Sequence, residues 1–228
     1  MGRVFLRANW QNLAMVSYAV PDELLVPRLP PGCELDRREG SAFVSLVAFE
    51  FLNTRVLGLK WPGMVNFLEW NLRFYVRQGE RRGVVFVREF VRNSVIAWAA
   101  RASYNEPYST ASLSQRITKE SMVYGVEWQG HEAEIELGLR PEPYLPQADS
   151  AEVWFTDQHW GFGRLRSGKR VAYAVEHPAW EVLPVTSVRV QLDWAAMYGA
   201  EWGVMQGAEP YNALFALGSE ATVARKST

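Results

Sequence analysis

Polar and apolar side chains alternate along residues 66–77, a segment with strong strand character. Its polar positions are Glu69, Asn71, Arg73, Tyr75 and Arg77, and its apolar positions are Leu68, Trp70, Leu72, Phe74 and Val76. A carboxylate among amide, guanidinium and phenol groups can bind a hydrogen-bond donor or act as a general acid or base. If the polar face lines a pocket, Glu69 is a candidate functional group. If that face meets water, Glu69 and Arg73 form a surface ion pair, and the pattern leaves both readings open.

A second group of candidate residues lies between Arg101 and Tyr108. Glu106 and Tyr108 flank Pro107, whose ring restricts the backbone and therefore the directions of these two side chains. Loops at strand ends often carry binding residues, and they equally often carry a tyrosine that closes a barrel mouth for structural reasons. The predicted ligand-binding set is Glu69, Asn71, Arg73, Arg101, Glu106 and Tyr108. Within it, Glu69 and Tyr108 are the candidates for catalysis.

Motifs for other chemistries are missing. The histidines His131, His159 and His177 lack metal-ligand spacing, and the single cysteine, Cys33, excludes an internal disulfide. No nucleophile elbow, phosphate-binding loop or complete dinucleotide fingerprint occurs. We therefore expect neither a metal nor a cofactor. If a histidine has a functional role, His177 is the best candidate, although a structural histidine at a strand end explains it as well.

Short strands separated by Gly, Pro and polar turns must position these residues. We expect strands at 12–18, 41–53, 66–77, 84–91, 95–104, 122–128, 132–139, 162–165, 170–176 and 211–224. Short helices are expected at 21–26, at 150–159 with Ser150 as cap, and at 194–198 with Asp193 as cap. The fold class predicted is mainly β (α+β), in one domain over residues 1–228, with an antiparallel sheet whose closure hides its edges.

Composition and charge narrow the range of partners. The chain is 48% hydrophobic and contains 10 Trp, 9 Tyr and 11 Phe, which suits a large core and the walls of a small-molecule pocket. Its 24 basic and 25 acidic residues give a net charge of −1, so neither nucleic acid nor a membrane is an expected partner. The absence of a long apolar run and of a signal-peptide pattern predicts a cytoplasmic protein.

Several stretches, taken together and in order, resemble the YqjF-like family of bacterial proteins, which has no assigned activity. These stretches are Trp10–Met15, Leu29–Gly32, Phe67–Val76, Tyr104–Tyr108 and Val175–Trp180. More remotely, the chain resembles acetoacetate decarboxylase. That resemblance implies a cone-shaped, largely antiparallel β-barrel that encloses a pocket, with a few short peripheral helices.

The resemblance also implies which reaction is absent. Acetoacetate decarboxylase forms a Schiff base through a lysine whose pKa is lowered by a second lysine and by an apolar pocket. Here Arg101 and Pro107 keep the motif's spacing, but the two lysine positions fall on Tyr108 and Ser109, which cannot form an imine. By the same alignment, a substrate-facing arginine falls on Gln11 and a second glutamate on Val47. The remaining glutamate of the motif falls on Glu69.

Three functional hypotheses follow. The first is a protein that binds a small organic molecule without covalent chemistry. The second is an enzyme using acid/base chemistry in hydrolysis, isomerisation or dehydration, with Glu69 as base and Tyr108 as acid or oxyanion donor. The third is an assembly protein whose aromatic surface supports a homo-oligomer.

Overall fold

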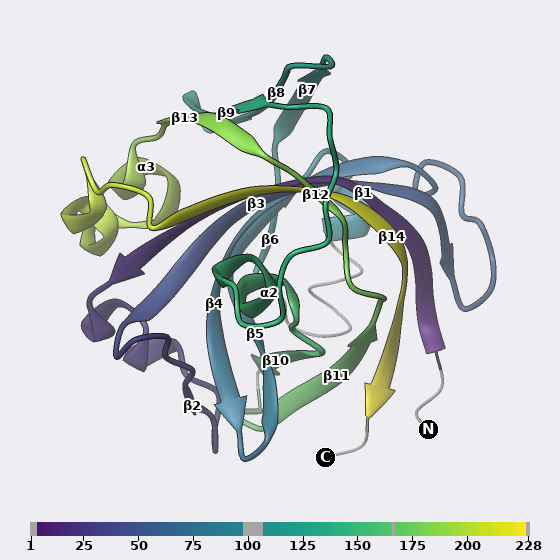
Figure 1. The fold of residues 1–228 in the computed structure, drawn as a ribbon. Helices are drawn as coiled ribbons and strands as arrows, with labels where there is room; N and C mark the ends of the chain where they lie inside the picture. Colours follow the sequence, from purple (N-terminus) through teal and green to yellow (C-terminus); the bar gives the residue numbers. More distant parts are fainter. Residues whose placement is uncertain (1–3, 98–106, 166, 227–228) are drawn as a thin grey trace.

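The computed structural model describes residues 4–97, 107–165 and 167–226, and most of them lie in strands (Figure 1). One sheet closes on itself in the order β4, β3, β1, β14, β11, β10, β5 and back to β4. These strands are β1 (Val4–Val20), β3 (Ala42–Val56), β4 (Phe67–Gln78), β5 (Arg81–Val91), β10 (Trp160–Arg164), β11 (Arg170–Glu176) and β14 (Asn212–Lys226). Neighbours are antiparallel except β5 and β10, which meet in parallel at Val84 and Gly161. The result is the predicted β-barrel.

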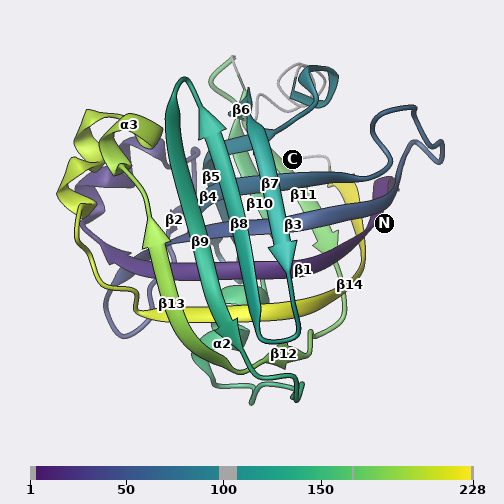
Figure 2. The ribbon, with the colours of Figure 1, turned by 90° about the horizontal axis from the view of Figure 1, so that it is seen from above.

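Three short strands extend this sheet: β2 (Glu34–Leu35) pairs with β4, β6 (Tyr108–Thr110) pairs with β5, and β12 (Val182–Leu183) pairs with β14. A second sheet of four antiparallel strands lies across the outside of the barrel wall, over β3, β1 and β14 (Figure 2). Its strands are β7 (Ser112–Ile117), β8 (Ser121–Trp128), β9 (His131–Leu139) and β13 (Val185–Gln191).

The two sheets create two separate hydrophobic cores. The sandwich core lies between the outer face of the barrel and the second sheet, where Trp70 and Leu72 of β4 belong to the same buried cluster as Ile135 of β9. The barrel core lies inside the ring and includes Leu13, Phe43, Val47 and Tyr75, among others. Because the barrel wall separates these cores, both faces of its central strands are buried.

Helical segments are short and peripheral, as predicted. They include the 3-10 helices Asp22–Leu24, Val26–Arg28 and Ala200–Met205, together with α2 (Ala151–Thr156) and α3 (Trp194–Tyr198). The predicted caps are confirmed, because Ser150 accepts a hydrogen bond from the Val153 N–H and Asp193 accepts one from the Ala196 N–H. The helix predicted at 21–26 is two 3-10 turns, since Pro27 in the second turn cannot donate a hydrogen bond.

One expected strand is wrong. Residues 95–97 of the segment 95–104 are helical rather than extended, and residues 98–104 lie outside the described residues. β5 ends at Val91, and the Asn93 side chain then accepts a hydrogen bond from the Val95 N–H, a contact that starts a helical turn. The predicted hairpins at 122–139 and 162–176 are confirmed as β8–β9 and β10–β11.

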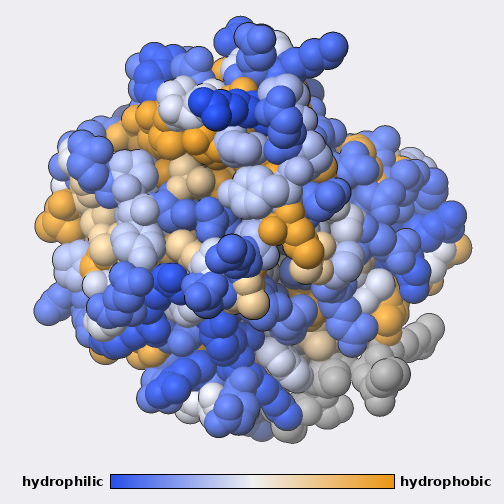
Figure 3. Space-filling view, viewed as in Figure 1, coloured by the Kyte–Doolittle hydropathy of each residue, from blue (hydrophilic) through white to orange (hydrophobic). Residues whose placement is uncertain are grey.

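The face of the molecule in Figure 3 is mostly hydrophilic, with hydrophobic residues gathered in separate patches. Among exposed apolar side chains, Leu57, Leu59 and Trp61 follow β3 in the loop toward β4. That such a surface supports a homo-oligomer stays a prediction. No helix in the described ranges is both long and apolar enough to cross a membrane.

Candidate functional site

Four side chains on neighbouring strands form a row along the inner face of the sheet. In the sheet register, Val47 of β3 lies opposite Asn71 of β4, Asn71 opposite Glu89 of β5, and Glu89 opposite Tyr108 of β6. Residues paired across neighbouring strands point to the same face of a sheet. All four side chains line a cavity inside the barrel, and so does Glu69, two residues before Asn71.

Two irregularities in the strands increase the number of side chains that reach this cavity. The β4–β5 register shifts between Leu72 and Arg73, so Phe86 and Glu89 both point inward although they are three residues apart. On β1 the register with β3 shifts between Gln11 and Ala14, with Asn12 at φ 55°, and Trp10 and Leu13 both line the cavity. Regular alternation would place one member of each pair outside the barrel.

The cavity has a volume of about 340 Å³ and predominantly apolar walls. The aromatic side chains in the wall include Phe49, Phe51, Phe67, Phe86, Trp160 and Trp180. The rings of Phe51 and Phe67 stack at 4.6 Å between centroids, and Trp10 packs edge-on against Phe49 and Phe51. A space of this size, with flat apolar walls and a few polar groups, suits a small organic molecule.

Glu69 is a buried acid in the cavity wall with a raised pKa. Its side chain is 3% exposed, its Oε2 accepts a hydrogen bond from the Tyr108 hydroxyl at 2.8 Å, and its Oε1 accepts one from Asn71 Nδ2 at 3.0 Å. Burial raises the pKa of Glu69 to about 7, against smaller lowering effects from the two hydrogen bonds and from the charge of Arg73. The carboxyl group can therefore hold or release a proton near neutral pH.

Tyr108 lies between two acids. Burial raises the pKa of its hydroxyl well above the ordinary value, and the charges and hydrogen bonds of Glu69 and Glu89 raise it further. The phenol therefore stays protonated over the physiological range and acts as a hydrogen-bond donor. Glu89 itself is 2% exposed, so the site contains a second buried carboxyl group.

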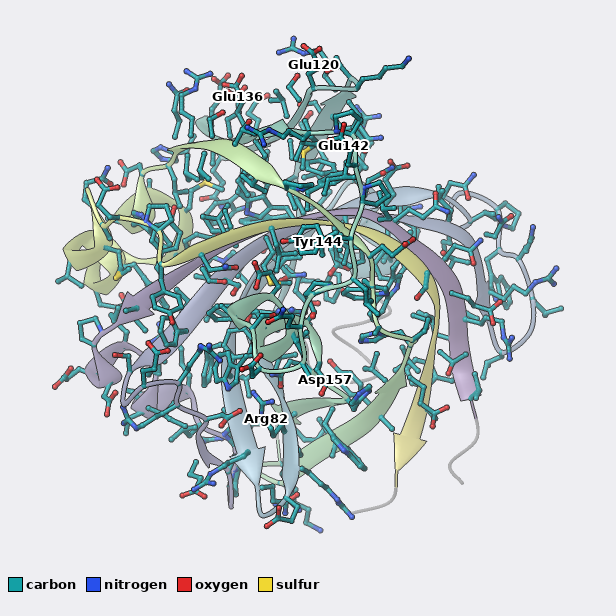
Figure 4. The ribbon with its side chains drawn as sticks, viewed as in Figure 1. Arg82, Glu120, Glu136, Glu142, Tyr144 and Asp157 are labelled. Atoms are coloured by element: carbon teal, nitrogen blue, oxygen red, sulfur yellow. The ribbon has the colours of Figure 1, made fainter. Side chains whose placement is uncertain are left out.

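The C-terminal end of α2 closes one end of the cavity. Arg73 Nη2 donates to the Phe155 carbonyl at 3.2 Å, and Gln158 Nε2 donates to the Trp154 carbonyl at 2.8 Å. Both Arg73 and Gln158 line the cavity. Figure 4 shows Arg82 and Asp157 beneath α2, on the side toward β10 and β11. Arg82 Nη2 also approaches the Trp154 carbonyl, which fixes the helix to the barrel wall.

His177 lies in another part of the cavity wall. Its ring stacks on Trp180 at 4.1 Å, and its Nδ1 lies 2.9 Å from the Pro178 carbonyl, which requires that nitrogen to donate. Burial lowers the pKa of His177, so the neutral ring is the dominant form at neutral pH.

The structure brings together most of the predicted set. Glu69, Asn71, Arg73 and Tyr108 share one cavity, so the alternative reading of Glu69 and Arg73 as a surface ion pair is wrong. Arg101 and Glu106 lie outside the described residues. Val47 lines the cavity as an apolar residue, as the alignment implied.

Sequence reasoning missed Glu89, Gln158 and Trp10. A strand pattern read with regular alternation does not reveal the shift that turns Glu89 inward. Gln158 lies within the helix predicted at 150–159, but α2 ends at Thr156, and the sequence carries no signal that the residues after it reach the cavity. Trp10 stood within a stretch that resembles the family, and this was the available signal.

Solved structures of similar shape define the class of fold. Acetoacetate decarboxylase from Legionella pneumophila superposes with a TM-score of 0.68 at 12% identity, over 97% of this chain and 85% of that one. The enduracididine biosynthesis enzyme MppR, in its complex with pyruvate, gives a TM-score of 0.67 at 14% identity, over 99% and 90% of the two chains. An acetoacetate decarboxylase-like enzyme from Sphingomonas wittichii RW1 gives 0.67 at 11% identity, over 99% and 93%. The chain therefore has the acetoacetate decarboxylase-like fold.

The family follows from sequence. Residues 7–220 match DUF2071, described as "Uncharacterized conserved protein (COG2071)", and the chain belongs to this family. The uncharacterized protein YqjF of Bacillus subtilis (strain 168) is 25% identical over 179 residues, which are 77% of this chain and 74% of YqjF. The predicted resemblance to the YqjF-like family is confirmed.

Proposed function

We propose that this protein binds a small organic molecule, without forming a covalent bond to it, in the cavity inside its barrel. The observation that carries the proposal is a cavity of about 340 Å³ whose apolar walls surround the buried Glu69–Tyr108 pair. Apolar walls supply affinity through surface burial, and a few fixed polar groups supply orientation.

The chemistry of the wall supports a non-covalent mode of binding. An imine needs an amine, and the side chains at the two motif positions are a phenol at Tyr108 and a hydroxyl at Ser109. Among the described side chains, Lys60, Lys119 and Lys169 are not part of the cavity wall. The hydrogen-bond partners of the Glu69 carboxylate are Asn71 and Tyr108 rather than a lysine ammonium.

Thermal-shift screening of small acids, amides and ketones tests the proposal. A ligand present at 100 times its Kd stabilises the folded protein by about 2.7 kcal/mol, which gives a clear shift in Tm. Borohydride treatment in the presence of pyruvate should leave the mass of the protein unchanged. A library without hits would contradict binding, and a reduced adduct of pyruvate would contradict the non-covalent mode.

A second candidate function is acid/base catalysis in the same cavity, favoured by the pKa of about 7 for Glu69. A general base works best when its pKa lies near the working pH, and this carboxyl is buried next to a protonated phenol. In such a reaction the Glu69 carboxylate takes a proton from a carbon next to a carbonyl group, and Tyr108 donates a hydrogen bond to the oxygen that gains charge.

Deuterium exchange separates the two candidates. An enzyme of this kind exchanges the α-protons of a bound ketone with D₂O, which NMR detects, and the rate rises with pH through an apparent pKa near 7. Glu69→Gln should abolish the exchange and leave binding in place. Binding without exchange over the ketones tested supports the binding protein.

A further inference from the structure

Four side chains that line the cavity each carry a buried polar atom without a hydrogen-bond partner among the described residues. These atoms are two donors and two acceptors: Trp10 Nε1, Arg73 Nε, Asn71 Oδ1 and Gln158 Oε1. A buried polar atom without a partner costs about 1–3 kcal/mol, so folded proteins rarely leave several in one place. Their concentration in one wall points to a molecule that supplies the missing partners.

Three of these atoms belong to Asn71, Arg73 and Gln158, of which the last two bind the C-terminal end of α2. Asn71 and Arg73 are two residues apart on the inward face of β4, and Arg73 donates to the Phe155 carbonyl of α2. Gln158 donates to the adjacent carbonyl, that of Trp154. Asn71 and Gln158 are 1% and 5% exposed, respectively, so bulk water does not satisfy them. Trp10 lies apart, among the aromatic side chains near Trp180.

Existing hydrogen bonds fix the direction of two of these groups. A carbonyl oxygen cannot donate, so the amide nitrogen of Gln158 must face the Trp154 carbonyl, which leaves Oε1 as the acceptor. The amide nitrogen of Asn71 donates to Glu69 Oε1, and the ionised carboxylate can only accept, which leaves Oδ1 as the acceptor. Arg73 is a donor at every nitrogen.

Arg73 Nε is a donor, and Asn71 Oδ1 and Gln158 Oε1 are acceptors. This combination limits which polar group of a ligand can bind all three atoms. A carboxylate offers acceptors alone and would face Asn71 Oδ1 and Gln158 Oε1 without a proton to share. An ammonium group offers donors alone and would leave Arg73 Nε without a partner. A ketone satisfies Arg73 Nε but neither acceptor. A primary carboxamide has one carbonyl oxygen and two N–H groups, which matches all three.

We propose that the α2 end of the cavity binds a primary carboxamide, with its oxygen toward Arg73 Nε and its two N–H groups toward Asn71 Oδ1 and Gln158 Oε1. This inference rests on the proposed function and names the class of its ligand. The rest of the ligand is flat and apolar, since the aromatic side chains Phe49, Phe51 and Phe67 form the adjoining wall. An aryl carboxamide is therefore the simplest molecule that fits both parts.

Calorimetric titration of the full chain with four matched probes tests the inference. The probes are benzamide, N,N-dimethylbenzamide, acetophenone and sodium benzoate, which share the ring and differ in the polar group. Benzamide should bind at least about tenfold more tightly than each of the others, because each of them leaves at least one buried group unsatisfied. Equal affinities for benzamide and acetophenone would overturn the carboxamide inference and leave the proposed function standing. Failure of all four probes would count against both.

A variant and a spectrum complete the test. Gln158→Met removes one acceptor with little change in volume, so benzamide should bind about tenfold more weakly while acetophenone binds as before. Gln191→Met, at an exposed position of β13, is the matched control and should change neither affinity. Should the Gln158 variant not fold, the side-chain amide signals of Asn71 and Gln158 in the ¹⁵N spectrum of the wild type serve instead. Both signals should shift with benzamide, and unshifted signals would overturn the inference.

Discussion

The two faces of β4 are both buried, and they differ in what buries them. Trp70 and Leu72 on the outer face are 0% exposed and pack in the sandwich core under the second sheet. Glu69 and Asn71 on the inner face are nearly as buried, at 3% and 1%, but they border a cavity. The outer face is filled with apolar side chains, as stability requires. The inner face carries polar groups that border a cavity, an arrangement that costs stability and suits ligand binding.

The largest expected effect of this difference is on the pH dependence of stability. Burial raises the pKa of Glu69 from 4.5 to about 7 in the folded protein, so the unfolded chain loses this proton first as pH rises. The free energy of unfolding should therefore fall by about 3 kcal/mol between pH 4.5 and pH 7 through this one group. Glu69→Gln should remove that fall, as measured by urea unfolding across the pH range.

Exposed Glu127 on β8 provides the control for this experiment. Glu127→Gln should keep the pH dependence of the wild type, because it makes the same change at an exposed position and leaves the buried Glu69 site intact. A Glu69→Gln curve parallel to that of the wild type would mean that the buried carboxyl titrates normally.

A matched pair of valines on β3 compares the two cores directly. Val44 and Val47 are both 0% exposed, but Val44 packs in the sandwich core and Val47 lines the cavity. Val44→Ala should cost about 2 kcal/mol, because it opens a void in a filled region. Val47→Ala should cost about half of that, since side chains beside a cavity can shift to fill part of the lost volume. Equal losses in chemical denaturation would mean that the barrel interior is filled.

Removing the Tyr108 hydroxyl should have a smaller effect, confined to the inner face. The hydrogen bond from Tyr108 lowers the pKa of Glu69, so Tyr108→Phe should raise that pKa above 7 and cost about 1 kcal/mol of stability. A ¹³C NMR titration of the Glu69 carboxyl measures the shift. Tyr124→Phe removes a hydroxyl that bonds to the Asn12 carbonyl and should leave the Glu69 titration unchanged.

The smallest effect concerns the two helix caps. Ser150→Ala and Asp193→Ala should each cost about 1 kcal/mol, since each removes one capping hydrogen bond. Ser150→Ala should also weaken the binding of a cavity ligand, because α2 closes the cavity. Asp193→Ala should leave that binding unchanged, because α3 packs in the sandwich core. Equal effects of the two substitutions on ligand affinity would mean that α2 does not contribute to the binding site.

The sequence predicted the two faces of β4 because alternation along one strand is a local property. The paired hairpins and the caps at Ser150 and Asp193 were predictable for the same reason. It could not predict that a second sheet covers the outer face, since this depends on contacts between distant segments such as Trp70 and Ile135. The position of Glu89 also escaped prediction, because a register shift within β5 reverses the alternation there.

Titration calorimetry with acetophenone, on the wild type and on Val47→Phe, tests most directly whether the barrel interior is a binding cavity. The larger side chain at position 47 occupies part of the cavity, so the wild type should bind one molecule saturably and the variant at least about tenfold more weakly. Val188→Phe, at a position 37% exposed on β13, makes the same change away from the cavity and should bind like the wild type. Equal binding by all three proteins, or no binding by the wild type, would contradict the account.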